Sequence, residues 1–77
     1  MPDKMPSVSG KKLLDYYLKQ GSELKRIKGS HHVIKSSFNQ KIFVIPIHKN
    51  EDLDRGTLHA ILTQSGVDIE YFLKTYK

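Results

Sequence analysis

The sequence predicts an α+β domain in which one helix precedes a three-stranded antiparallel sheet and two helices follow it. Two observations support this class. Apolar residues recur at helical spacing near both ends of the chain, and the middle holds short β-branched runs separated by turn residues. With 77 residues the chain can form one small domain. Because the loops between the strands are short, the strands must be antiparallel, and the helices are expected to cover one face of the sheet.

The first helix is predicted over residues 10–20. Ser9 is a favourable N-cap, and Val8 and Leu13 have the spacing of a hydrophobic staple. Gly21 stands where a glycine often ends a helix. The helical period directs one apolar face toward the core. The expected core face is Leu13, Leu14, Tyr17 and Leu18, and the expected polar face is Lys12, Asp15, Tyr16 and Lys19.

Three strands are predicted, over residues 23–27, 31–36 and 41–45. A turn at Lys28-Gly29-Ser30 joins the first two strands, and a hairpin loop over residues 37–40 joins the last two. The run 41–45 is the most apolar, which favours a central position in the sheet. Pro46 lacks a backbone donor and is therefore expected to end the ladder.

Two helices are predicted after the sheet. Asp54 can cap the first of them, which ends at Gly66, and Asp68 can cap a short last helix. The apolar residues of the last helix that are expected to face inward are Ile69, Phe72, Leu73 and Tyr76. The resulting α-β-β-β-α order with a short extra C-terminal helix is the layout of the double-stranded RNA-binding domain, although a layout does not prove a function.

Residues 1–8 contain two prolines and no periodicity, and they are predicted to form a flexible tail before a single domain over residues 9–77. Cysteine is absent, which excludes a disulfide scaffold and a thiolate metal site. No apolar run approaches the ~20 residues of a membrane span, and the N-terminus does not have the pattern of a signal peptide. A cytoplasmic protein without a membrane partner is expected.

Positive charge is concentrated in the first half of the chain. The formal net charge is +5. Residues 1–41 hold nine basic and three acidic side chains, a net charge of +6, whereas residues 42–77 hold four basic and five acidic side chains, a net charge of −1. A basic half of this kind is typical of proteins that bind a polyanion such as nucleic acid.

The segment Lys28-Gly29-Ser30-His31-His32 can carry chemistry. Turn amides next to a glycine can form a nest for an anion, and an imidazole exchanges protons near physiological pH. Cleavage of RNA needs a base for the 2′-hydroxyl, an acid for the leaving 5′-oxygen and cations for the phosphoryl oxygens. Adjacent histidines of a strand point to opposite faces and rarely share a metal, so no metal site and no cofactor are expected. The simpler interpretation is a hairpin turn followed by two ordinary histidines.

Several segments resemble the HicA family of mRNA interferase toxins. They include the stretch from Leu24 to Ile34 around Gly29-Ser30-His31, the segment Val44-Ile45-Pro46-Ile47-His48, and the segment from Gly56 to Leu62. The resemblance runs from about Ser9 to Leu73. It implies a fold like that of double-stranded RNA-binding domains, metal-independent cleavage of single-stranded mRNA by a histidine of the Gly-Ser-His motif, and inhibition by a HicB-type antitoxin.

The motif holds two histidines, so the catalytic role falls to His31 or His32. We favour His31 and expect the other histidine to face the helices and to be partly buried against Leu24 or Leu58. The expected RNA-binding residues are Arg26, Lys28, Gly29 and Ser30 beside the motif, with Lys25, Lys35 and His48 as weaker candidates. The alternative is a non-catalytic RNA-binding module of the same fold, which would share the basic face and lack the cleavage.

Overall fold

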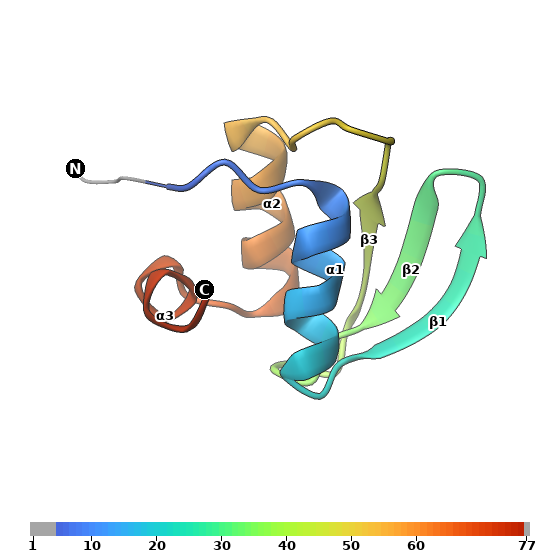
Figure 1. Ribbon diagram of the computed structural model, residues 1–77. Coiled ribbons are helices and arrows are strands. Elements are labelled where there is room, and N and C mark those ends of the chain that lie inside the picture. Colours follow the sequence, from blue (N-terminus) through green and yellow to red (C-terminus); the bar gives the residue numbers. More distant parts are fainter. Residues whose placement is uncertain (1–4, 77) are drawn as a thin grey trace.

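The computed structural model describes residues 5–76, and its element order confirms the predicted α+β fold (Figure 1). Each predicted element is present, and most bounds agree with the prediction to within a residue. The elements are α1 (Gly10–Lys19), β1 (Glu23–Lys28), β2 (His31–Lys35), β3 (Ile42–Pro46), α2 (Arg55–Ser65) and α3 (Ile69–Thr75). Of the helices in this described part, none is long and apolar enough to cross a membrane.

The strands form one antiparallel sheet in the order β1-β2-β3 (Figure 1). The prediction that the apolar third strand lies at the centre is therefore wrong: β2 is central and β3 is an edge. Helices α1 and α2 cover one face of the sheet, which we call the inner face, and leave the other, the outer face, open. Ile34, Phe43 and Ile45 point into the core from the inner face.

Pro46 ends the strand, as predicted, but one further backbone hydrogen bond joins the chain to the segment before β2. Pro46 is the last residue of β3 and lies opposite His31. The next backbone N–H, that of Ile47, still donates to the Ser30 carbonyl at 2.8 Å. Because alternate residues of a strand donate to the same side, the missing N–H of Pro46 falls on the open edge, where it costs no ladder bond.

The capping predictions are confirmed for the two longer helices. The Ser9 hydroxyl accepts from the Lys12 N–H at 3.1 Å, and the Asp54 carboxylate accepts from the Thr57 N–H at 2.7 Å. These hydrogen bonds satisfy donors that a helix leaves free in its first turn. Asp68 holds the N-cap position of α3 without a side-chain cap bond.

Helix α3 packs on α1 and not on the sheet (Figure 1). Tyr16, which was expected on the polar face of α1, is consequently buried: its ring lies 5.0 Å from that of Phe72, and its hydroxyl pairs with the Thr75 hydroxyl at 2.7 Å. Leu18 and Leu73 were expected to face inward, but both are exposed. The apolar periodicity of α1 predicts only the face that packs on the sheet. It does not predict a second buried face, which α3 creates by packing against Tyr16.

Part of the predicted tail packs with the domain. Residues 1–4 lie outside the described part of the chain. Val8 is fully buried, and its carbonyl accepts from the Leu53 N–H at 2.8 Å. Ser9 also forms an isolated bridge with Asp52. The segment before α1 is thus tied to the connector that leads into α2.

A buried polar cluster joins α1, α2 and the loop after β2. The Tyr17 hydroxyl pairs with the Ser65 hydroxyl, and the Ser36 hydroxyl donates to the Ser65 carbonyl at 2.6 Å. Burial, opposed by the bond to Ser65, raises the pKa of Tyr17 to about 12. The ring of Tyr17 lies 4.6 Å from that of Phe43, so the cluster stands directly behind the inner face of the sheet.

Candidate functional site

The outer face of the sheet carries cations along β1 and apolar residues along β3. Residues that pair across antiparallel strands lie side by side on the same face, so the register defines three rows. From the hairpin end these rows are Lys28–His31–Pro46, Arg26–Val33–Val44 and Glu23–Lys35–Ile42. His31 therefore lies between a cation and an edge residue, on a face that no described helix covers.

The turn that precedes His31 is held by a glycine. Gly29 has φ +59°, a conformation that side-chain-bearing residues rarely adopt, and no atom lies within 4 Å of the position a Cβ would take there. The requirement at Gly29 is thus conformational and not steric. Gly29 is exposed and Ser30 is half-buried, which leaves the backbone of the turn open to a ligand.

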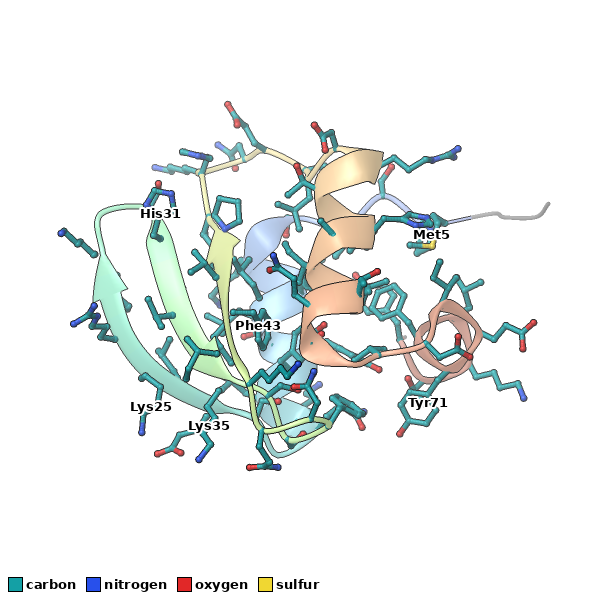
Figure 2. All side chains as sticks on the ribbon, turned by 180° about the vertical axis from the view of Figure 1, so that it is seen from behind. Met5, Lys25, His31, Lys35, Phe43 and Tyr71 are labelled. Carbon is teal, nitrogen blue, oxygen red and sulfur yellow. The ribbon has the colours of Figure 1, made fainter. Side chains whose placement is uncertain are left out.

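The two adjacent histidines lie on opposite faces of β2, as predicted. His31 is exposed on the outer face beside Lys28, and Figure 2 shows it at the hairpin end of the strand. His32 is half-buried on the inner face, between Ile27 and Ile45. Leu24, which was one expected neighbour of the inward histidine, pairs instead with Ile34.

The ring of His32 is engaged by the backbone. Its Nδ1 lies 3.2 Å from the Ser30 carbonyl. A carbonyl oxygen only accepts, so Nδ1 carries the hydrogen in this contact and Nε2 is the acceptor in the neutral ring. The same carbonyl accepts from Ile47, and His32 therefore contributes to holding the turn next to the end of β3.

The predicted cations differ in their surroundings. Arg26 and Lys28 are exposed on the outer face and make no ion pair with any residue from 5 to 76. Lys25, at the irregularity between Leu24 and Arg26, lies 3.6 Å from the Glu23 carboxylate, which compensates its charge. Lys35 is four residues from His31 along β2, roughly 13 Å at the usual rise of a strand, and Figure 2 shows Lys25 and Lys35 at the end of the sheet away from His31.

His48 follows β3 and is exposed. The alternation of the strand continues past Pro46, because Ile47 packs against the core and His48 does not. The structure thus brings the hairpin end of the outer face, with Lys28 and His31, next to the segment that holds His48. It separates His32 from this group by placing it on the other face.

Sequence reasoning missed the apolar side of this face. Ile42 is 55% exposed and Val44 is 38% exposed, and half-buried Val33 lies between Val44 and Arg26. The uninterrupted apolar run of residues 42–45 contained the signal, because a strand with one covered face usually alternates with polar residues. We interpreted this run as a sign of a central strand, whereas β3 is an edge strand whose outer face is open.

The candidate site is an open surface. Hollows of about 460 and 590 Å³ exist in the described part, but His31 lines neither of them: one lies between α1 and α3 and the other beside β3 and α2. Within residues 5–76 no three His, Cys, Asp or Glu side chains come together in a way that could hold a metal ion.

Comparison with known proteins identifies the family. The family model described as the HicA toxin of bacterial toxin–antitoxin systems matches residues 10–67, from the start of α1 to just past α2. Neither the curated proteins nor the solved structures contain a match. The matched range covers the sheet, its turn and both helices of the inner face, and it leaves α3 outside. The chain therefore belongs to the HicA toxin family, and such membership implies an antitoxin as its partner.

Proposed function

We propose that this HicA-family chain is an endoribonuclease that cleaves mRNA, with His31 as a catalytic residue. The supporting observation is the place of His31: an exposed imidazole opposite Lys28 in the strand pairing, behind a glycine turn, on a sheet face that none of the helices in residues 5–76 covers. A histidine beside a cation on an open basic surface is suited to proton transfer on a polyanion.

The proposed reaction uses the RNA itself as nucleophile. The 2′-oxygen loses its proton to a base and attacks the adjacent phosphorus, and the 5′-oxygen leaves with a proton from an acid. His31 takes part in this proton transfer. Lys28 and Arg26 stabilise the negative charge that builds on the phosphoryl oxygens. Within residues 5–76 neither side chain forms an ion pair with an acidic residue, so both charges are available to the phosphate.

The outer face suits a single-stranded substrate. The phosphates would follow the cations of β1, and the amides and hydroxyl of Gly29 and Ser30 would donate to the phosphate at the turn. The unpaired bases would pack on Val33, Val44 and Ile42. Lys35 would contact a phosphate further along the strand, whereas Lys25, compensated by Glu23, would contribute less.

An antitoxin of the HicB type would inhibit the enzyme by covering the same face. A surface with cations on one side and apolar residues on the other fits a partner with acidic and apolar side chains. The antitoxin and the RNA would then compete for Lys28 and His31. This competition would take place in the cytoplasm, where mRNA is found.

Product analysis tests the proposal. The purified chain, incubated with mRNA in EDTA, is expected to release fragments with a 2′,3′-cyclic phosphate and a 5′-hydroxyl, because the 2′-oxygen is the nucleophile and histidine supplies the proton transfer. RNA that carries a 2′-O-methyl group at the cut site is the matched control and should resist. A 5′-phosphate product or cleavage of DNA would contradict the mechanism. Binding of RNA without any cleavage would favour the non-catalytic RNA-binding module.

A further inference from the structure

The proposed reaction needs two proton transfers on opposite sides of one phosphate, but β2 presents only one histidine to the outer face. His32 points to the inner face, where its Nδ1 contacts the Ser30 carbonyl. His59 lies on α2, in the helical layer behind the sheet. Arginine cannot give up its proton in a protein, and Brønsted behaviour favours an imidazole over an ammonium group as the transferring acid or base.

We propose that His48 is the second proton-transfer residue of the site, which makes it a catalytic partner of His31. This inference rests on the proposed ribonuclease function and extends it. One histidine of the pair removes the proton from the 2′-oxygen, and the other protonates the 5′-oxygen.

The register carries the proposal. Pro46 lies opposite His31, and His48 is two residues further in the direction in which β3 leaves the sheet. One backbone hydrogen bond follows the last pair of the ladder, because the Ile47 N–H donates to the Ser30 carbonyl at 2.8 Å. Residues diagonal to each other across an antiparallel pair have Cα atoms about 7–8 Å apart, within reach of aromatic-sized side chains. Two imidazoles at that separation can reach opposite sides of one phosphate group.

The backbone around His48 is fixed, as a catalytic residue requires. The His48 carbonyl accepts from the Glu51 N–H at 3.2 Å in a turn in which Asn50 has φ +61°. On the other side, α1 begins against the end of β3: a Cβ on Gly10 would lie 2.6 Å from the Pro46 carbonyl oxygen. Only a glycine permits this approach. The backbone that carries the exposed side chain of His48 is therefore held at a defined position next to the turn.

The proton balance of the step is complete without another reactant. The O2′–P bond forms and the P–O5′ bond breaks, one histidine gains the 2′ proton, and the other loses a proton to the 5′-oxygen. The enzyme ends with the two imidazoles in exchanged protonation states, and exchange with solvent restores them. Lys28 keeps its charge throughout and stabilises the phosphoryl oxygens.

The leaving-group dependence of variants tests the pair. Wild type, His31→Ala and His48→Ala are assayed on an RNA that contains the mapped cut site, and on the same RNA with sulfur in place of the scissile 5′-oxygen. A thiolate leaves without protonation, so the general acid becomes dispensable on the sulfur substrate. On the ordinary RNA each variant should lose about 10²–10⁴ in rate, the usual contribution of general acid–base catalysis. On the sulfur RNA one of the two should recover toward the wild-type rate and the other should not.

Control variants separate this result from other causes. His59→Ala removes an exposed histidine outside the face and should cleave both substrates like wild type. His48→Gln keeps a polar side chain of similar size and should behave like His48→Ala. Cleavage of ordinary RNA by His48→Ala at the wild-type rate, or the same response of both histidine variants to sulfur, would overturn the pairing and leave the ribonuclease proposal intact. Lack of cleavage by wild type would instead overturn the proposed function itself.

Discussion

The two faces of β2 differ in what their side chains do, although both faces are formed by alternate residues of the same five-residue strand. The inner face presents His32 and Ile34, which lie opposite Ile45 and Phe43 and belong to the layer beneath α1 and α2. The outer face presents His31, Val33 and Lys35 to solvent. Neighbouring side chains of a strand point to opposite faces. In β2 this alternation alone places the core residues on one face and the residues of the proposed chemistry on the other.

This division is incomplete near the hairpin. Ile27 lies on the inner face opposite His32, yet it is 56% exposed, because the hairpin extends past the helices that cover the rest of that face (Figure 1). The inner face is thus a packed core at its centre and an accessible surface at the turn. In the middle of β2 we expect inner-face variants to lower stability and outer-face variants to lower activity. Near the turn we expect this difference between the two faces to be smaller.

The largest expected effect is on cleavage by the adjacent histidine variants. His31→Ala should stay folded, bind RNA and lose about 10²–10⁴ in cleavage rate, the usual effect of losing a general acid or base. His32→Ala should keep measurable turnover and lose about 1–2 kcal/mol of unfolding free energy, typical of a part-buried substitution. Cleavage kinetics and thermal unfolding of both variants provide the check. The reverse pattern would move the catalytic role to His32.

The next effect is on stability at the middle of the strand. Ile34 is fully buried, so Ile34→Ala should cost about 2–5 kcal/mol of unfolding free energy. Val33→Ala, one residue away on the outer face, should cost much less and should weaken RNA binding instead. Chemical denaturation and binding titrations measure the two effects. Equal losses of stability would show that the outer face is also packed in solution.

A smaller effect is expected in the salt dependence of RNA binding. If about four phosphates of a single strand are neutralised, the slope of log K against log salt should be near −3. Lys28→Ala should make the slope shallower by about 0.7, the share of one phosphate contact. Lys25→Ala should change it less, because Glu23 compensates the charge of Lys25. Identical slopes for the two lysine variants would remove the distinction between free and compensated cations.

The smallest effect concerns alkaline stability of the core behind the inner face. The folded-state pKa of Tyr17, about 12, exceeds the ordinary value near 10 because the phenol is buried. Its stabilising contribution is therefore complete below pH 10 and is lost as the pH rises toward 12. Tyr17→Phe should unfold with a weaker dependence on pH in this window than wild type, whereas Tyr71→Phe, at an exposed ring, should follow wild type more closely. If the unfolding free energies of wild type, Tyr17→Phe and Tyr71→Phe fell in parallel with rising pH, the alkaline loss of stability would not come from Tyr17.

Local rules predicted the elements well because each depended on nearby residues. Ser9 and Asp54 cap their helices through contacts within one turn of the chain, and Gly29 fixes the hairpin through its own φ. The opposite orientation of His31 and His32 followed in the same way from strand geometry. Such features need no knowledge of distant segments.

What sequence could not predict depended on packing between distant elements. Tyr16 is buried against Phe72 of α3, and the carbonyl of the buried Val8 accepts from Leu53 in the connector before α2. The central place of β2 also depends on the order of strands in space, which the apolar run of β3 suggested wrongly. The proximity of His48 to the hairpin end required the register of β2 against β3, which no local pattern specifies.

The proline at the open edge of β3 limits how another chain can attach to this domain. An edge strand normally offers a row of unpaired donors and acceptors to which a partner can add a further strand. Beside His31 that row lacks a donor, because Pro46 has no N–H and its ring nitrogen occupies the position that faces outward. An added strand would have to stop before this point. A protein that covers His31 from the β3 edge must therefore do so with side chains laid across the outer face, and this edge is protected from further strand addition at the end where the chemistry is proposed.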